Sequence, residues 1–407
     1  MAYIPYSPEQ GFLLPPSVAE VLGSEHLCFF VHQVVERLDL REFEESYSGE
    51  GQRAYAPAMM LKLWFYAYTQ GVTSSRQLER LTRENLAYRY LAGNLRPDHW
   101  TLNEFLRRHR MAVNTVFTQV VEFARAGGMG KLGVVAVDST RVRANASRDR
   151  LDTVRRLRNQ RARLRREIRN WQQKAAGESS AERGEGGLGE GGMERLQRQL
   201  ASLPRRLEEL ERSGRKQRSP VDPDSRMMRS RDGFLLGYSG EIAVSEDHLI
   251  VAQRVTQAGN DNASLAPMVA EVERHCGAPP RVVLADAGYF AYEQLRRLRE
   301  RGVEALVPDS MLSQEMRTGR RAGWPAGAIR DALHRQVRRR LRSGAGRALY
   351  DLRRGLVEPI FGVLKEQRHL RRFRRRGLPA VGVEFSLACT AYNLTRMFRS
   401  GLRCAQA

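Results

Sequence analysis

The spacing of hydrophobic residues divides the 407-residue chain into a helical first part and a mixed second part. In the first part, apolar positions recur at helical intervals. Ser74 with Gln77, and Thr101 with Glu104, have the composition of capping boxes, which predicts that short helices begin there. Short helices with interleaved arginines are typical of helix-turn-helix DNA readers, and an ordinary helical packing domain fits the same pattern. We expect residues 1–128 to form a helical, DNA-binding N-terminal domain.

From residue 132 onward the pattern alternates between strand and helix. Residues 132–138 are a continuous apolar run that predicts a buried strand, and residues 233–256 predict a β-hairpin that turns at Glu246 and Asp247. The following segments predict a helix, a strand, a helix and a short strand, at residues 262–275, 281–289, 291–302 and 303–309. This order is typical of a mixed α/β sheet with helices on its faces, and we expect a second domain over residues 129–400.

Residues 150–218 interrupt this order between the first strand and the hairpin. Their apolar positions have coiled-coil spacing: one set repeats every seven residues and the other alternates steps of four and three, at Leu157, Leu164 and Trp171 and at Leu196, Leu200, Leu203, Leu207 and Leu210. A glycine-rich segment separates the two sets, so we predict an inserted helical hairpin with a flexible tip. Pro204 predicts a kink or a late start in the second helix. The leucines either pack in a core or belong to a protruding arm that touches DNA or a second subunit.

The charge of the chain is strongly positive. Lys and Arg number 68 against 46 Asp and Glu, so the net charge is +22 and the pI is about 10.6. This excess favours a polyanionic partner, above all nucleic acid, because neutralising phosphates releases condensed counterions. A basic surface that serves only solubility is the alternative.

Cysteine spacing and hydropathy exclude several other classes of protein. The four cysteines form no Cys-x-x-Cys pair, which argues against a thiolate zinc site and a disulfide framework. The eight histidines form no His-x-His or His-x-x-x-His pair, so we expect them on the surface or in packing roles. No apolar run reaches the roughly 18 residues of a membrane span. We therefore expect a cytoplasmic, nucleoid-associated protein without membrane contacts.

Two predicted strands end on an aspartate. The run "KLGVVAVDST" ends its apolar stretch at Asp138, and "RVVLADAGYF" does so at Asp286. If the two strands are parallel and adjacent, both carboxylates lie at one edge of the sheet, where ligand-binding groups gather. Two close carboxylates raise each other's pKa unless a cation lies between them, and Mg²⁺ prefers such oxygen ligands. A single aspartate at a strand end is more often a helix cap, and it is the repetition that favours a metal site.

A third acidic ligand is expected from the segment "LYDLRRGLVEPIFGVLKEQRHL". An apolar stripe at helical spacing, formed by Val357, Ile360, Phe361 and Leu364, predicts a buried helix face. Glu358 and Lys365 flank this stripe, and Arg354 precedes Glu358 by one turn. Pro359 predicts that the helix kinks or begins there. Asp351, Glu366 and Glu384 are the competing acids, and each lies on another flank of the stripe or on the next helix.

A run of arginines follows the predicted helix. Six arginines occupy the nine positions from Arg368 to Arg376, with Phe373 among them. A solvated charge run is the usual explanation. Because this run directly follows the predicted metal-binding helix, we expect it to bind phosphates near the scissile bond.

These motifs together resemble the DDE transposases of bacterial insertion sequences. "VVAVDST", "VLADAGY" and the series Tyr350, Arg354, Glu358 and Lys365 are similar to the group that carries a tyrosine, arginine, glutamate, lysine signature. The resemblance covers nearly the whole chain, including "YAPAMMLKLWFYAY" in the first part and "RRFRRRGLPAVGVEFSLACTAYNLTRM" near the end. It departs from the family at Tyr350, which is separated from Arg354 by three intervening residues instead of the more common two.

The resemblance implies an RNase H-like catalytic domain over residues 129–400, with the helical hairpin inserted in it. It implies that Asp138, Asp286 and Glu358 are the catalytic acids and bind two Mg²⁺ ions, for which Mn²⁺ can substitute. It also implies that the basic signature residues lie near DNA. With the arginine run, the expected DNA-binding residues are Tyr350, Arg354, Lys365, Arg371, Arg372, Arg374 and Arg375.

The expected function is metal-dependent cleavage and strand transfer of DNA at the ends of an insertion sequence. The partners are double-stranded DNA, as terminal inverted repeats and as target, and a second copy of the chain in a DNA-bound homodimer. The alternative is a DNA-binding protein or an RNase H-like nuclease that is derived from a transposase and has lost strand transfer. The segment "RTGRRAGWPAGAIRD" matches nothing in the resemblance and is left without a role.

Overall fold

A six-stranded mixed sheet forms the centre of the described structure. The computed structural model describes residues 17–47, 54–177, 190–230, 233–320 and 331–402. The strands are β1 (Val134–Arg143), β2 (Arg226–Ser230), β3 (Gly233–Ser245), β4 (Ile250–Thr256), β5 (Val282–Leu284) and β6 (Glu304–Leu306). Their order is β2-β3-β1-β5-β6, with β4 also paired to β3. The predicted first strand, hairpin and two later strands are confirmed, and β2 is a strand that the apolar pattern did not predict.

The direction of the pairings gives the sheet its RNase H-like character. β3 is antiparallel to β1, β2 and β4, whereas β5 is parallel to both β1 and β6. A helix connects the parallel neighbours β5 and β6, as a parallel pair requires, and another helix lies between β4 and β5 in the sequence. The fold class is therefore the mixed, helix-covered α/β sheet that the sequence predicts.

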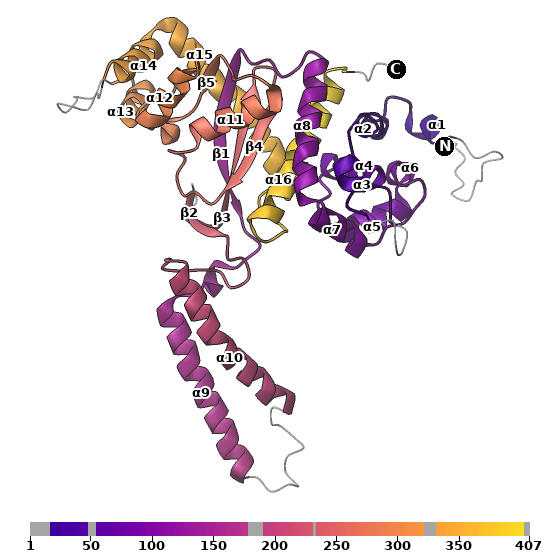
Figure 1. Cartoon of the computed structure of the whole chain (residues 1–407), viewed down its shortest axis with the longest axis vertical. Helices are drawn as coiled ribbons and strands as arrows, with labels where there is room; N and C mark the ends of the chain where they lie inside the picture. Colours follow the sequence, from indigo (N-terminus) through magenta and orange to yellow (C-terminus); the bar gives the residue numbers. More distant parts are fainter. Residues whose placement is uncertain (1–16, 48–53, 178–189, 231–232, 321–330, 403–407) are drawn as a thin grey trace, which may run out of the picture.

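Helices cover both faces of this sheet. They are α11 (Leu265–Cys276), α12 (Tyr292–Glu300), α13 (Ser310–Thr318), α14 (Ala332–Arg342), α15 (Gly344–Gly362), the π-helical turn η3 (Val363–Gln367) and α16 (Leu378–Arg399), with short 3-10 turns η1 (Arg148–Arg150) and η2 (Ala287–Tyr289). A Cβ atom at Gly240 would lie 2.7 Å from the Phe385 ring of α16. The next residue, Glu241, accepts a hydrogen bond from Ser264, which precedes α11. Because neighbouring strand residues point to opposite faces, α16 and α11 cover opposite sides of the sheet (Figure 1).

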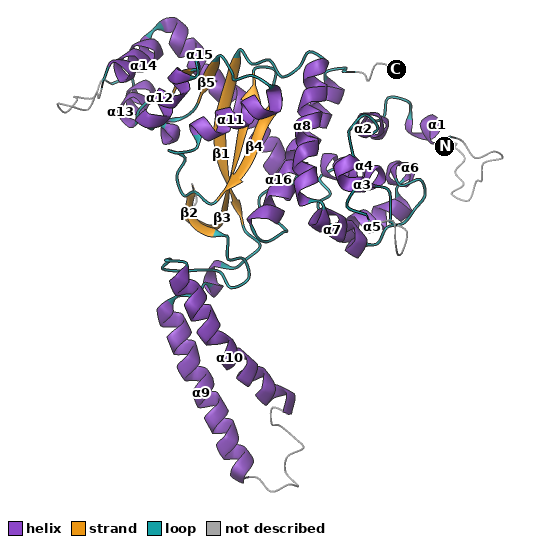
Figure 2. Ribbon diagram, viewed as in Figure 1, coloured by secondary structure: helices purple, strands orange, loops and turns teal. Residues whose placement is uncertain are grey.

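The first part of the chain is helical, as predicted. It contains α1 (Val18–Leu22), α2 (Leu27–Val35), α3 (Arg41–Glu44), α4 (Pro57–Thr69), α5 (Ser75–Glu84), α6 (Leu86–Leu91), α7 (His99–Arg108) and α8 (Arg110–Ala126). Helix α16 packs against α8 and α4, so the apolar residues of these helices and of the sheet form one contiguous core. Figure 2 shows α16 between the sheet and the N-terminal helices.

The predicted capping boxes differ in detail from the observed helix starts. Helix α5 begins after Ser74, but the Ser74 side chain makes no capping hydrogen bond. Helix α7 begins two residues earlier than Thr101, because the Asp98 carboxylate accepts a hydrogen bond from the Thr101 amide at 2.6 Å. Aspartate caps a helix at least as well as threonine does. Helix α7 begins after Asp98 because the Asp98 carboxylate is positioned to accept this hydrogen bond.

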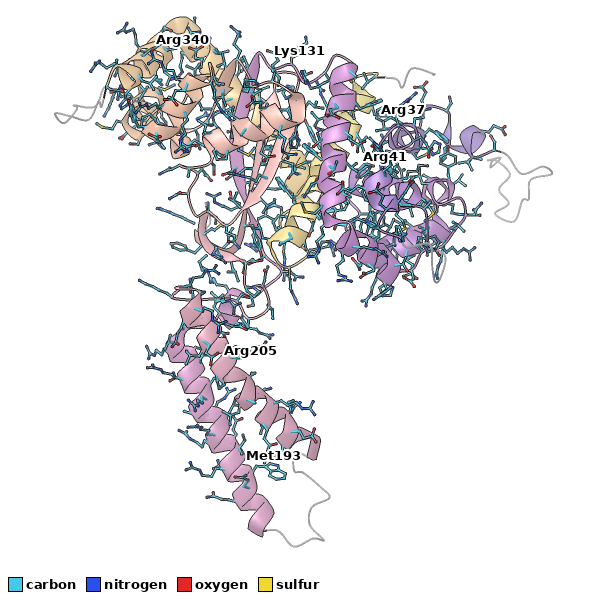
Figure 3. The ribbon with its side chains drawn as sticks, in the orientation of Figure 1. Arg37, Arg41, Lys131, Met193, Arg205 and Arg340 are labelled. Carbon is cyan, nitrogen blue, oxygen red and sulfur yellow. The ribbon has the colours of Figure 1, made fainter. Side chains whose placement is uncertain are left out.

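The insertion is a helical hairpin that projects from the sheet domain (Figure 1). Helices α9 (Val154–Gly177) and α10 (Glu190–Arg212) pack through a cluster of their own, formed by Leu157, Leu164, Leu203 and Leu210. Figure 3 shows side chains along both helices, with Arg205 labelled on α10. The glycine-rich tip, the start of the chain and most of the unassigned segment before α14 lie outside the described residues.

Both helices that contain an internal proline run through it. Helix α10 begins at Glu190 and includes Pro204, so it does not start late. Helix α15 begins at Gly344 and includes Pro359, so it does not begin at that proline. In each case one backbone hydrogen bond is lost, and packing of the apolar face compensates for it. Within the described residues, none of the helices combines the length and the apolar composition needed to cross a lipid bilayer.

Candidate active site

The two predicted aspartates lie side by side at one edge of the parallel strand pair. In the β1–β5 register, Ala136 is paired with Leu284, and each stands two residues before its aspartate. Side chains two residues apart point to the same face, and neighbouring strands lie about 4.8 Å apart. Asp138 lies on β1 and Asp286 directly follows the end of β5, so the two lie close together at one edge of the sheet, as the sequence predicts, and the Asp286 carboxylate acts on the pKa of Asp138.

Burial and a neighbouring carboxylate perturb Asp138. Its side chain is 18% exposed. The pKa of Asp138 is raised to about 6, mainly by burial; Arg353 lowers it, and the nearby Asp286 carboxylate contributes to the rise. The backbone N–H of Ser139 donates a hydrogen bond to Asp138 Oδ1 at 2.7 Å. Asp286 is half-buried and accepts a hydrogen bond from the Gly288 N–H at 2.9 Å.

Arg353 is the cation that the fold brings to these acids. Its Nη1 atom donates to Asp138 Oδ2 at 2.8 Å, from a buried position on α15. Tyr350, one turn earlier, packs against the core, and burial raises its pKa while Arg353 lowers it. The sequence analysis named Arg354, which is exposed, and did not consider Arg353. The Tyr350–Arg353 spacing of two intervening residues was the signal that could have identified it.

Glu358 lies on α15 but does not join the aspartates in this structure. The apolar stripe beside it is buried as predicted, at Val357, Ile360, Phe361 and Leu364. Glu358 itself is exposed and makes no hydrogen bond or ion pair with a described residue. Among the described residues there is no group of three or more His, Cys, Asp or Glu side chains that could hold a metal ion. The role of Glu358 as third ligand stays a prediction.

Lys365 lies in the π-helical turn η3, which continues α15. Such turns insert one residue into a helix and are frequent at functional sites. Leu364, beside it, is fully buried, and Lys365 is half-buried. Lys365 is therefore held at the end of the helix that carries Arg353 and Glu358.

The arginine loop, residues 371–376, is anchored in the fold and is not a free charge run. The Phe373 N–H donates to the Arg143 carbonyl at 2.8 Å, which joins the loop to the end of β1. The Phe373 ring is buried against Tyr238. The buried Glu384 carboxylate accepts hydrogen bonds from the backbone N–H groups of Arg374 and Arg375, all at 3.0 Å.

The side chains of the arginine loop have different partners. Arg371 pairs with the exposed Glu366, and Arg372 donates to Asn145 Oδ1 at 3.0 Å. Arg374 and Arg375 reach the N-terminal helical region, where they donate to Thr73 and Asn103 at 2.6 and 3.0 Å. The loop therefore connects the sheet to the N-terminal helices, a role that sequence reasoning did not predict.

A polar network on the opposite face of β1 was also missed. Arg141 pairs with Asp261 at 3.1 Å, and the Ser139 hydroxyl donates to the same carboxylate at 3.0 Å. Glu241, fully buried on β3, pairs with Arg254. The strand alternation after Asp138, with Ser139 and Arg141 on the other face, was the available signal.

Fold and site together define a class of protein. An RNase H-like sheet with paired aspartates at the ends of its two central parallel strands, beside a basic surface, is typical of enzymes that act on nucleic-acid phosphates. Residues 17–108 match the family model of a transposase domain, and residues 212–394 match that of the transposase DDE domain. The chain belongs to the DDE transposases of insertion sequences, which act on DNA in transposition. Comparisons with curated proteins and with solved structures give no significant match.

Proposed function

We propose that this chain cleaves DNA at the terminal inverted repeats of its insertion sequence and transfers the released strand ends to target DNA. The observation that carries the proposal is the parallel β1–β5 register, which brings Asp138 and Asp286 to one edge of the sheet. Phosphoryl transfer needs little covalent chemistry from the protein, so positioning and charge are its main tasks. Paired carboxylates on a rigid sheet meet the first requirement.

We assign Asp138, Asp286 and Glu358 as the residues that would hold two Mg²⁺ ions, with Mn²⁺ able to substitute. The pair fits a hard divalent cation, because both are oxygen donors and the pKa of Asp138 is raised to about 6 by burial and by its neighbour. Glu358 stands five residues after Arg353 on α15, which is about 7.5 Å along the helix axis. When bound, the metal supplies a Lewis acid that lowers the pKa of water or of a 3′-hydroxyl and neutralises charge on the phosphate.

The basic residues around these acids orient the DNA. Arg353 forms an ion pair with Asp138 at 2.8 Å. Tyr350, Arg354 and Lys365 lie on α15 and η3 and are proposed to contact the DNA backbone beside the scissile phosphate. The arginine loop, through Arg371, Arg372, Arg374 and Arg375, extends this basic surface toward the N-terminal helices. Those helices, within residues 1–128, are proposed to recognise the terminal repeats.

The proposed assembly is a homodimer on DNA. An insertion sequence has two ends, and each chain contains one pair of strand-end aspartates. Two copies would therefore supply one active site for each end.

Cleavage of the element's own ends by the purified full-length chain tests the proposal. We expect cleavage and joining with Mg²⁺ or Mn²⁺ and none with EDTA. Asp138→Ala, Asp286→Ala and Glu358→Ala should each abolish cleavage and leave DNA binding within about twofold. Asp351→Ala is the matched control, because Asp351 is an exposed acid on the same helix.

Each alternative has its own outcome in this experiment. Cleavage without joining would show a nuclease that lacks strand transfer, and binding without cleavage would show a DNA-binding protein. Wild-type cleavage by Glu358→Ala would show that the third ligand is another residue.

A further inference from the structure

A basic groove separates helix α7 from the arginine loop. Its volume is about 680 Å³, and it is lined by Trp100 and Arg107 on the N-terminal side, by Arg110 at the start of α8, and by Arg374, Arg375 and Arg376 on the other. The walls come from regions more than 260 residues apart in the sequence. This explains why sequence reasoning did not identify the groove.

The charge of the groove is strongly positive. Five of the lining residues are arginines and one, Glu104, is acidic, which leaves four net positive charges. Glu104 is already paired with Arg107 at 2.6 Å. Such a concentration of guanidinium groups in a concave surface attracts a polyanion and focuses its field.

Hydrogen bonds to neighbouring residues hold the arginines of the loop wall. Arg375 donates to Asn103 at 3.0 Å, and Arg376 donates to the Asn145 carbonyl at 3.0 Å. The backbone behind them is fixed by the buried Glu384. A guanidinium has five N–H donors, so each of these side chains keeps donors for a phosphate after its internal bond is made.

Trp100 is the unusual member of the groove. It lies in the first turn of α7 and is 68% exposed, whereas Trp64 on α4 is 1% exposed. Within the described residues its ring takes part in no aromatic pair and no cation–π contact. Tryptophan is highly buried on average, so a ring left open beside five arginines has an accessible face for a planar ligand.

The combination of an open aromatic ring and a basic groove suits unpaired nucleotides. Base–aromatic stacking contributes about 1–3 kcal/mol per base, and a base offers its face to a side chain where it is unpaired and can unstack from its neighbours in the strand. Intact duplex offers phosphates but keeps its base faces covered. Strand cleavage, which the proposed function supplies, produces ends where bases become available.

The groove is also separate from the acids. The arginine loop contacts the end of β1 at Arg143, five residues after Asp138, which is about 16 Å along a strand. A DNA strand can therefore occupy the groove while its end lies near Asp138. Substitutions in the groove can change binding without removing a catalytic group.

We propose that this groove binds unpaired nucleotides next to a DNA strand end, with Trp100 stacked on a base and the arginines on the backbone phosphates. The proposal rests on the proposed function, since cleavage creates such ends. The ligand is DNA rather than an acidic peptide, because DNA offers both a base that can stack on Trp100 and repeated phosphates that can pair with the arginines.

Binding of the full-length chain to three labelled probes in EDTA tests the proposal. The probes are a 20-nucleotide oligo(dT), a blunt 20-base-pair duplex, and the same duplex with a single-stranded 3′ extension of six nucleotides. Trp100→Ala should weaken binding of oligo(dT) and of the extended duplex about tenfold, and binding of the blunt duplex less than about threefold. Trp100→Phe should retain most of the affinity, because phenylalanine keeps a stacking face.

A matched control and a spectroscopic measurement separate stacking from general damage. Phe234 on β3 is an aromatic residue that is 63% exposed outside the groove, and Phe234→Ala should bind all three probes like the wild type. Oligo(dT) should quench the tryptophan fluorescence of the wild type, and Trp100→Phe should remove most of this quenching.

The outcomes distinguish this inference from the proposed function. Equal binding of oligo(dT) by Trp100→Ala and wild type, or an equal loss for Phe234→Ala, would overturn the groove proposal even if the wild type cleaves its ends. A wild type that binds neither oligo(dT) nor the extended duplex would also overturn the groove proposal, whereas the proposed function fails only if the wild type does not cleave the element's own ends.

Discussion

At the residue scale, the site is organised around one buried acid and the cation that faces it. Asp138 is largely buried, beside a second carboxylate, and Arg353 donates to it from α15. Ionisation of Asp138 is unfavourable in this environment, and Arg353 compensates only in part, since the pKa remains above its usual value.

This arrangement predicts a pH-dependent stability. The pKa of Asp138 rises from 3.8 to about 6 on folding, so the folded state binds more protons between these two pH values. Ionised Asp138 therefore destabilises the fold, and its cost grows from about pH 4 and is complete above about pH 6. Relative to the wild type, the free energy of unfolding of Asp138→Asn should rise between pH 4 and pH 7. The increase is at most about 3 kcal/mol, and the lost contact with Arg353 reduces it. Urea unfolding in EDTA measures the difference, and a gap that does not change with pH would contradict the prediction.

Arg353 and the adjacent Arg354 should behave differently when substituted. Arg353→Ala removes the partner of a buried carboxylate and should lower the free energy of unfolding by about 2 kcal/mol at pH 8. Arg354→Ala changes an exposed side chain and should lower it by less than about 0.5 kcal/mol. Urea unfolding in EDTA compares the two variants. Equal losses would show that the Arg353–Asp138 contact does not contribute to stability.

At the element scale, the inserted arm closes its own ends. Asp152 and Arg218 exchange two backbone hydrogen bonds, at 2.8 and 3.0 Å, and Asp152 also pairs with Arg206. The apolar cluster of the arm is separate from the main core. The sheet therefore does not depend on the arm for its packing. The arginines of α9 are solvent-exposed. The role of the arm that remains to be tested is therefore contact with DNA or with a second subunit.

Replacement of the arm by a short linker should leave the sheet intact. When residues 153–217 are exchanged for a Gly-Ser turn, the two ends can still form the Asp152–Arg218 bridge, and loop closure changes by only about 0.6 kcal/mol per doubling of length. We expect a cooperative thermal transition and retained Mg²⁺ binding, with loss of paired-end assembly and strand transfer. Circular dichroism and gel-shift assays measure these properties. An unfolded variant would show that the arm supports the core, and unchanged strand transfer would show that it has no role in assembly.

At the scale of the whole molecule, the N-terminal helices and the sheet share one core. Helix α16 is buried along both α8 and β4, and Asn393 on α16 exchanges hydrogen bonds with the backbone of Ile250 at 2.8 and 2.9 Å. The arginine loop adds polar contacts between the same two parts. The groove proposed for unpaired DNA lies at their junction, so its geometry depends on both.

This shared core predicts that the two parts do not fold well when separated at residue 128. A fragment of residues 129–407 would expose the face of α16 that packs on α8 and α4 in the whole chain. We expect aggregation or a broad, non-cooperative unfolding transition in calorimetry, whereas the full chain unfolds cooperatively. A fragment with a sharp transition and a monomeric elution volume would show that residues 1–128 and 129–407 are independent domains.

The sequence alone determined most of the elements and their order, because hydrophobic period and strand-end polarity are local properties of the chain. It predicted the first strand, the hairpin, the alternating helices and strands, the arm, and the meeting of Asp138 with Asp286. Only the tertiary structure decided which arginine reaches Asp138, since Arg353 and Arg354 differ only in the helix face they occupy. It also decided that the arginine loop is anchored by Glu384 and that Trp100 faces it across a groove. These contacts join segments up to about 300 residues apart, and packing of the whole core, rather than any local pattern, brings them together.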